Sequence, residues 1–275
     1  FVSTVSLGSE RQGAATITIN CNAGVFSATS VWQAAPPVIV PVGSIEQHGP
    51  HCPMDVDISA PFHLAVAAAQ AIDDFPVIVA PPQQYGFTHY NMGEIGTITL
   101  SLETFIATLN DIARSIWANG FRRIIMLNGH GGNEQPNWAA AVKIAEEDVW
   151  VLALTYWHMA DPELLAWSEA DAGSIGHAGE WETSLQLYMR EHLVDIDRAV
   201  EDPWRGRWGA ERGRFGAFPG RRREAEHGVM GNPLVASREK GERLFGVLLE
   251  RLIGTCREYH EMEPPRYREF GTHCP

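Results

Sequence analysis

Histidines and carboxylates gather in residues 41–57, with the sequence PVGSIEQHGPHCPMDVD. Glu46 and His48 are two residues apart, so in an extended backbone both side chains point to the same side, as a metal requires of ligands at a strand end. Glycine and proline then turn the chain back on itself. The same segment holds His51, Asp55 and Asp57. A polar turn with solvated histidines is the alternative, but this density of ligand types favours a functional site.

A second cluster is the loop LNGHGGNEQ, residues 127–135, which follows an apolar run. His130 stands among glycines, which allow the backbone to approach an ion or a ligand closely. The loop lacks the lysine of a phosphate-binding loop, and the chain has no GxGxxG fingerprint of a dinucleotide site. A solvated loop histidine is the alternative. The carboxyl end of a strand, however, is where α/β sheets bind their ligands.

The third cluster is GHAGEWETS, residues 176–184, in which His177, Glu180 and Glu182 precede an apolar-periodic stretch. The helix dipole favours acidic residues in a first turn, so each glutamate is as readily a capping residue as a ligand. One of the two could cap the helix while the other takes part in chemistry.

Together the three clusters supply histidine and carboxylate without cysteine, and these donors suit Zn, Mn or a similar divalent ion. A serine nucleophile would call for a GxSxG elbow, which the sequence lacks. Cys52 lies near histidines, but a metal-binding turn explains its segment better than a thiol nucleophile does. The residues alone therefore predict a metal-dependent hydrolase.

Alternating strands and helices must position these clusters. Short, β-branched runs predict strands at 38–43, 76–82, 122–129 and 149–157. Helices are predicted between them, at 61–72, 102–116 and 135–147. Ser59 and Pro61 open the first helix, whereas Ser101 caps the second and Gly120 stands beyond its end. Three such alternations favour an α/β sandwich with a mostly parallel sheet.

The rest of the chain departs from this pattern. Weak alternation at 15–20 predicts an extended arm or edge strand, and two helices are predicted at 181–192 and 238–259. Between them lies an excursion near 203–233 that is rich in Gly, Arg and Pro and contains Arg221, Arg222 and Arg223 in succession. No repeat or linker divides the chain, so residues 1–275 are expected to form a single domain.

Composition limits the class of protein. Of 275 residues, 45% are apolar and 21 basic side chains face 34 acidic ones, so the net charge is 21 − 34 = −13. Disordered and fibrous classes are excluded, and a pI near 5.3 argues against nucleic acid or an anionic membrane as the main partner. No apolar run approaches the ~18–20 residues of a membrane span. The four cysteines, Cys21, Cys52, Cys256 and Cys274, have no CxxC spacing, so a reduced, cytoplasmic protein is expected; a secreted enzyme with one incidental disulfide is the alternative.

The three motifs PVGSIEQHGPHCPMDVD, NGHGGN and HAGEWETS, in this order and at these separations, resemble those of the creatininase (creatinine amidohydrolase) family over residues 36–190. The resemblance implies a three-layer α/β/α sandwich and two divalent metal ions, Zn or Mn. It implies two ligand sets that share one carboxylate: Glu46, Asp57 and His130 for one ion, and His48, Asp57 and Glu182 for the other. It also implies a homo-oligomer, commonly a hexamer in the family.

The family chemistry, carried over by this resemblance, uses a hydroxide that bridges the two ions and attacks a carbonyl whose oxygen a metal polarises. His177 would then donate a proton to the leaving group. One position departs from the pattern: creatininase carries a metal-binding glutamate two residues after the loop histidine, where this chain has Gly132. The missing carboxylate counts against creatinine as the substrate and weakens or opens the first metal position.

The expected substrate is a small molecule, either a cyclic amide that is opened or a linear amide that is cleaved. Family members also act on a cyclic keto-inositol, so opening of a cyclic ketone with C–C cleavage is an alternative. A metal- or ligand-binding protein that keeps the fold without activity is a further one, because of Gly132.

Candidates for the pocket wall are aromatic. The loop YGFTHYNMGE, residues 85–94, offers Tyr85, His89 and Tyr90 together with Phe87, and the third motif offers Trp181. Core or interface packing is the alternative for all of them. The Arg-rich segment 205–223 would suit an anionic substrate or the acidic face of a neighbouring subunit.

Overall fold

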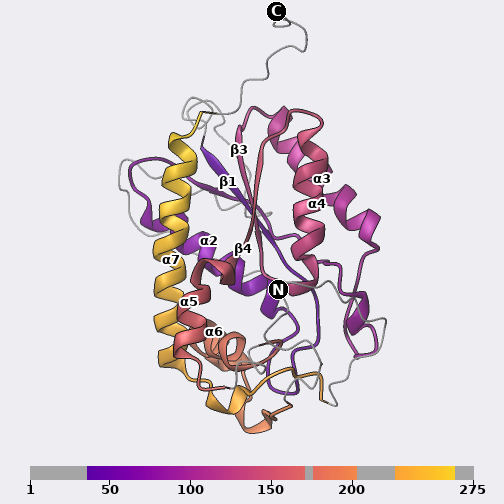
Figure 1. Cartoon of the computed structure of the whole chain (residues 1–275), viewed down its shortest axis with the longest axis vertical. Helices are drawn as coiled ribbons and strands as arrows, with labels where there is room; N and C mark the ends of the chain where they lie inside the picture. The colour runs from indigo at the N-terminus through magenta and orange to yellow at the C-terminus, as the bar shows by residue number, and fades with distance from the viewer. Residues whose placement is uncertain (1–35, 171–175, 203–226, 264–275) are drawn as a thin grey trace, which may run out of the picture.

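The computed structural model describes residues 36–170, 176–202 and 227–263, and a parallel sheet lies at its centre (Figure 1). The strand order is β2-β1-β3-β4, and each neighbouring pair runs parallel. The strands are β1 (Pro37–Val42), β2 (Ile78–Val79), β3 (Arg123–Asn128) and β4 (Val151–Thr155). All four occur where the sequence predicted strands.

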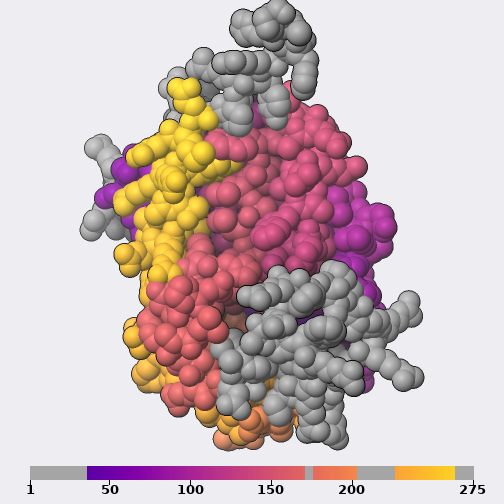
Figure 2. All heavy atoms as spheres, viewed as in Figure 1, coloured from indigo at the N-terminus to yellow at the C-terminus, as the bar shows by residue number. Residues whose placement is uncertain are grey.

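Helices cover both faces of this sheet (Figure 1). One face packs against α3 (Leu102–Ala118) and α4 (Glu134–Ala145). The other packs against α2 (Val56–Ala71) and α7 (Arg238–Glu261), with α6 (Glu180–Arg190) alongside α7. In the space-filling view the yellow α7 forms one flank of the molecule (Figure 2). The structure therefore has the three-layer α/β/α sandwich that the resemblance implied.

Alternate residues of β3 enter different cores. Ile125 and Leu127 pack with α2 and α7, whereas Ile124 and Met126 pack with α3 and α4, and all four side chains are fully buried. A parallel sheet covered on both faces has no solvent side, so its strands are continuous apolar runs. For this reason the β-branched runs of the sequence located the strands.

Helix α3 begins and ends as the sequence predicted. The Ser101 side chain accepts a hydrogen bond from the Thr104 N–H, and Gly120 adopts a φ of 94° beyond the last turn. A short helix, α5 (Asp161–Trp167), follows β4. Single 3₁₀ turns lie at His89–Asn91, Gly131–Asn133, Tyr156–Ala160, Glu191–Leu193, Ile196–Arg198 and Pro233–Val235.

The first helix begins earlier than predicted. Asp55 rather than Ser59 is the N-cap, and Pro61 lies inside α2. Proline lacks the N–H that would bond the carbonyl of the residue four positions earlier, which is Asp57. Pro61 lies in the second turn of α2, whereas the sequence prediction placed it in the first turn and therefore began the helix too late.

Strand β2 is shorter than the predicted 76–82. Its ladder with β1 covers Ile78 and Val79, and an isolated bridge joins Gln83 to Val42 further on. Pro76, Pro81 and Pro82 flank the ladder, and proline has no N–H to donate to a strand ladder.

The C-terminal helices are present as α6 and α7, with α7 extending to Glu261. The expected strand near 15–20 and residues 203–226 of the Arg-rich excursion lie outside the described residues, and the single-domain expectation stays a prediction. No helix in the described parts of the chain is long and apolar enough to cross a membrane. Cys52 and Cys256 are free thiols.

Candidate metal centre

Two neighbouring strands carry the first two clusters to one edge of the sheet. Val42 and Asn128, at the ends of β1 and β3, are paired in register. Glu46 and His48 follow β1, and His130 follows β3. The Asn128 side chain accepts a hydrogen bond from the His130 N–H at 3.1 Å and donates one to the His130 carbonyl at 2.8 Å. The histidine loop is therefore fixed to the strand that precedes it.

Glycines at both strand ends bring the start of α2 to this edge. A Cβ added at Gly43 would lie 2.7 Å from Ile58 Cα, and one at Gly129 would lie 2.2 Å from the carbonyl oxygen of Asp57. These distances are too short for any side chain, so only glycine allows the helix backbone to pack here. The close packing holds Asp57, in the first turn of α2, over the strand ends.

The first group of donors consists of Glu46, Asp57 and His130, all at most 3% exposed. Nδ1 of His130 lies 2.8 Å from Glu46 Oε2 and 2.9 Å from Asp57 Oδ2. One potential ligand atom from each residue lies within 4.8 Å of the other two. The structure thus brings together three of the residues singled out in the sequence.

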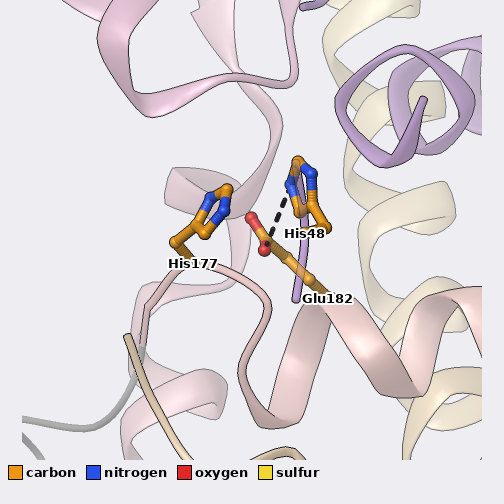
Figure 3. Close-up of side chains that lie close together, drawn as sticks. All are labelled: His48, His177 and Glu182. Atoms are coloured by element: carbon orange, nitrogen blue, oxygen red, sulfur yellow. Dashed lines mark ion pairs between the residues drawn. The ribbon is translucent and has the colours of Figure 1, made fainter. Parts of the chain in front are cut away.

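The second group consists of His48, His177 and Glu182, which likewise lie within 4.8 Å of one another. Figure 3 shows the Glu182 carboxylate, from the first turn of α6, pointing toward the imidazole of His48. Nε2 of His48 lies 3.6 Å from Glu182 Oε2, and the rings of His48 and His177 are 4.2 Å apart. The implied set for this ion contained Asp57 and not His177.

Asp57 nevertheless connects the two groups. Its Oδ1 lies 3.0 Å from Nε2 of His48, and its Oδ2 lies 2.9 Å from Nδ1 of His130. The two oxygens of one carboxylate therefore face one histidine of each group. This is the arrangement in which a carboxylate can bridge two ions.

The turn before α6 shapes the second group. The Ala178 N–H donates to Glu182 Oε2 at 2.6 Å, and Ala178 has the unusual φ of 55°. Nε2 of His177 lies 2.6 Å from the Gln47 carbonyl, and its Nδ1 lies 3.5 Å from Glu46 Oε1. His177 and Glu182 are 12% and 19% exposed, so this group faces solvent more than the first group does.

The electrostatics reflect buried carboxylates around the histidines. Burial disfavours the charged form of His48, but Asp57, Glu182 and Glu46 outweigh it and raise the pKa of His48 to about 9. Burial likewise opposes charge on His130, and Tyr90, Glu46 and Asp57 raise its pKa well above the usual value. Burial raises the pKa of Glu182 to about 7, although His48 acts in the opposite direction. The buried carboxylates of Glu46, Asp57 and Glu182 therefore favour binding of a cation between them and the histidines.

The donor set fits divalent metal ions. It offers imidazole nitrogens and carboxylate oxygens and no thiolate, as Zn and Mn sites in proteins do. Cys52 lies 3.8 Å from Thr183 Oγ1, and burial raises the pKa of its thiol to about 12. A thiol held protonated at neutral pH is a poor nucleophile, which agrees with the sequence interpretation.

The substrate-pocket candidates separate in the structure. Tyr90 lies against the first group, with its hydroxyl 3.3 Å from Nε2 of His130, and His89 packs beside Phe87 on the same loop. Tyr85 is 44% exposed. Trp181 is only 6% exposed and belongs to the core cluster that includes residues of α2 and α7, so its place in a pocket wall stays a prediction.

The two glutamates of the third motif have different surroundings. Glu182 belongs to the second group, whereas the Glu180 carboxylate accepts hydrogen bonds from the backbone N–H groups of Glu169 and Ala170 at 3.0–3.1 Å. Lys240 Nζ of α7 lies 2.6 Å from the same carboxylate. Glu180 thus anchors a loop to α7, a role for which sequence spacing gave no signal because the partners are far apart in the chain.

Sequence reasoning also missed the partner of His51. Nε2 of this buried histidine lies 2.9 Å from Thr183 Oγ1, next to Glu182 in α6. Burial, assisted by the neighbouring His48, lowers the pKa of His51 to about 4, so it is neutral at pH 7. The contact joins the first motif to the third without adding charge.

Comparisons with known proteins agree with this geometry. A family model described as Creatininase: Creatinine amidohydrolase matches residues 27–256. The creatinine amidohydrolase of Pseudomonas putida is 31% identical over 238 residues, which are 80% of this chain and 88% of that protein. The mycofactocin precursor peptide peptidase of Mycolicibacterium smegmatis is 32% identical, with 82% and 86% covered. The 3-dehydro-scyllo-inosose hydrolase of Thermotoga maritima is 30% identical, with 82% and 78% covered.

Solved structures show the same architecture. A crystal structure of creatinine amidohydrolase (creatininase) has a TM-score of 0.72 and 28% identity, with 85% of this chain and 93% of that chain covered. A structure titled "Creatininase Mn" gives the same TM-score and identity, with 84% and 94% covered. Another creatininase structure is described as Zn-Zn type, with a TM-score of 0.70, 28% identity, and 84% and 93% covered.

Proposed function

Because the chain belongs to the creatininase family of metal-dependent hydrolases, we propose that it hydrolyses a small cyclic or linear amide at a binuclear metal centre. The observation that carries this proposal is the position of Asp57. One of its carboxylate oxygens lies 3.0 Å from Nε2 of His48 in the second group, and the other lies 2.9 Å from Nδ1 of His130 in the first group. Both distances are short enough for the paired atoms to bind the same ion. This geometry supports a single carboxylate shared by two neighbouring ions.

In this proposal Glu46, Asp57 and His130 hold one ion, and His48, Asp57 and Glu182 hold the other. Zn and Mn are the proposed metals, since both suit nitrogen and carboxylate ligands and both appear in the titles of creatininase structures. Divalent ions at this place would supply a water nucleophile at neutral pH and polarise a carbonyl oxygen.

His177 is the proposed proton donor. Its ring is held at the boundary of the two groups by the Gln47 carbonyl, and it is the histidine there that reaches solvent, at 12% exposed. An imidazole can donate a proton to a departing amine near neutral pH. The substrate would approach from the side of His177 and Glu182, because the first group is closed to solvent.

A cyclic ketone is the second candidate substrate. The observation that favours it is the similarity, 30% identity over 254 residues, to the Thermotoga maritima 3-dehydro-scyllo-inosose hydrolase. In that case the attacked carbonyl would be a ketone and a C–C bond would break. A panel of lactams, linear amides, formamides and keto-cyclitols separates the two: opening of the ketone without any amide turnover would decide for the second.

Metal content tests the binuclear centre. Elemental analysis of the purified protein is expected to give two divalent ions per chain, one for each group. Asp57→Asn should bind fewer than two and lose hydrolysis, because both sets lose their shared ligand. Asp55→Asn is the matched control in the same turn, since Asp55 faces Arg190 at 2.7 and 2.8 Å and not the cluster; it should keep both ions.

Two results would reject the proposal. One is full activity in protein stripped of metal, and the other is an Asp57→Asn variant that still binds two ions. Wild-type protein with fewer than one tightly bound ion and no turnover on added Zn or Mn would instead support a binding protein without activity.

A further inference from the structure

Tyr90 lies directly behind the metal-facing side of His130. Its hydroxyl oxygen is 3.3 Å from Nε2 of His130, and the planes of the two rings differ by only 16°. The ring centroids are 6.1 Å apart, too far for face-to-face contact, so the phenol meets the edge of the imidazole. Tyr90 comes from the 3₁₀ turn His89–Asn91, which no sequence motif of the metal centre includes.

The two nitrogens of His130 have different surroundings. Nδ1 faces the carboxylates of Glu46 and Asp57 at 2.8 and 2.9 Å, so Nδ1 is the atom available to an ion in the first group. A neutral imidazole that binds metal through Nδ1 carries its hydrogen on Nε2. That hydrogen points to Tyr90, and a metal-binding histidine commonly donates its second N–H to such a partner.

The space between Gly132, the imidazole of His130 and the hydroxyl of Tyr90 has no room for a further side-chain atom. A Cβ added at position 132 would lie 2.6 Å from Nε2 of His130, 2.6 Å from the Tyr90 hydroxyl and 2.5 Å from the Phe87 carbonyl oxygen. Real Cβ atoms do not approach other atoms this closely. A side chain at 132 would therefore displace either the imidazole or the phenol.

We propose that Tyr90 is a positioning residue of the metal centre: its hydroxyl oxygen accepts the Nε2–H hydrogen bond of His130 and so holds Nδ1 toward the first ion. Gly132 then leaves the room that the Tyr90 hydroxyl occupies. This inference rests on the proposed function, since it concerns one of the two proposed ions.

Zinc affinity tests it directly. Metal-free wild type and Tyr90→Phe are titrated with Zn²⁺ in competition with a chromophoric chelator. Tyr90→Phe should weaken one of the two sites by about 10- to 100-fold and leave the other unchanged, because loss of such a partner affects the ligand it supports. Tyr188→Phe is the control: Tyr188 packs against Phe245 and Arg238, away from both groups, and should leave both affinities unchanged.

The zinc affinity of Gly132→Ala provides a second test of the same contact. It should weaken the same site, and the loss in the Tyr90→Phe/Gly132→Ala double variant should be smaller than the product of the two single losses, because both act through His130. The melting temperature of metal-free Tyr90→Phe should match that of the wild type. A merely structural tyrosine would lower that temperature and weaken both sites together.

Unchanged affinities at both sites in Tyr90→Phe would overturn the inference and leave the binuclear centre standing. Equal weakening of both sites would overturn it as well. Failure of the wild type to bind two Zn²⁺ ions would refute the proposed function itself, and the two failures are therefore distinguishable.

Discussion

His177 stands between two roles, a ligand of the second ion and a donor of protons. Its ring lies 4.2 Å from that of His48, and with Glu182 the two could hold an ion. Asp57, however, already faces His48 at 3.0 Å, so in the proposed set the second ion would have three ligands without His177. The proton-donor role leaves both sets complete and uses the more exposed imidazole.

His177→Gln separates the roles. If His177 donates a proton, kcat/KM should fall by about 10²- to 10⁴-fold while the protein keeps two ions per chain. Steady-state kinetics together with elemental analysis of the same preparation measure both quantities. Loss of one ion in the variant would make His177 a ligand.

The proposed ligands could be predicted from the sequence, but the contacts that hold their segments in position could not. Glu46 and His48 are two residues apart and Asp57 lies in the same segment, so motif and spacing singled them out. His51 and Thr183, by contrast, are separated by 132 residues, and nothing in either segment indicates the other. The same is true of Tyr90 and His130, whose contact depends on the path of a loop.

At the scale of elements, the glycines at the strand ends are as important to the site as its ligands. Gly129→Ala would place a Cβ 2.2 Å from the Asp57 carbonyl, so the strand end or the start of α2 must move. We expect the free energy of unfolding to fall by about 1–3 kcal/mol, as for other overpacked sites. Zinc affinity should fall too, because Asp57 moves with its helix.

Urea denaturation and zinc titration check the Gly129→Ala variant. Gly246→Ala in α7 is the control, since its Cβ would meet nothing within 4 Å; it should be neutral or stabilising by about 0.5–1 kcal/mol. A Gly129→Ala protein as stable as the wild type, with unchanged zinc affinity, would contradict this account of the strand ends.

A histidine bridge joins two further elements. Nε2 of His158 lies 2.9 Å from Glu134, at the start of α4, and its Nδ1 lies 2.9 Å from Asp161, at the start of α5. The hydrogen bond to Glu134 raises the pKa of His158 to about 9; partial burial opposes this and Asp161 adds to it. The bridge is therefore charged at neutral pH.

The pH dependence of this bridge has a definite sign. The pKa of His158 is about 9 in the folded protein against the ordinary histidine value of 6.5, so its contribution to stability is fully present below pH 6.5 and is lost as pH rises through 9. The difference in urea midpoint between wild type and His158→Gln should shrink in the same way. A difference that stays constant from pH 6 to pH 10 would contradict the prediction.

Elements with strong local signals were predicted well. Helix α3 has an apolar period, a serine cap and a terminal glycine that agree with one another. The predicted N-cap of α2, Ser59, lies four residues after the observed one, Asp55, because Pro61 is accommodated inside the helix where the strand-end glycines pack. Strand β2 was predicted too long, since apolar runs do not show where proline interrupts the ladder: beyond Pro81 and Pro82 it continues only as an isolated bridge between Gln83 and Val42.

At the scale of the whole molecule, metal removal should lower stability. Glu46, Asp57 and Glu182 concentrate acid in a buried space of a chain whose net charge is already −13. An ion at 100 times its Kd stabilises a fold by about 2.7 kcal/mol, which for a chain of this size is a melting-temperature change of roughly 5–10 °C per site.

Thermal unfolding with and without a chelator measures this effect. EDTA is expected to lower the melting temperature of the wild type, and added Zn²⁺ or Mn²⁺ should restore it. Asp57→Asn should show a smaller response. The same melting temperature with and without EDTA would mean that ions do not contribute to the folded state.

The order of the ligands along the chain has a consequence for biosynthesis. The first group, Glu46, Asp57 and His130, is complete once the ribosome has made β3 and its loop. The second group is complete only at Glu182, 182 − 130 = 52 residues after His130. If the two groups hold ions as proposed, the emerging chain acquires the donors of one ion well before those of the other. Each chain would then be able to bind its first ion during synthesis, before the ligands of the second ion have been made.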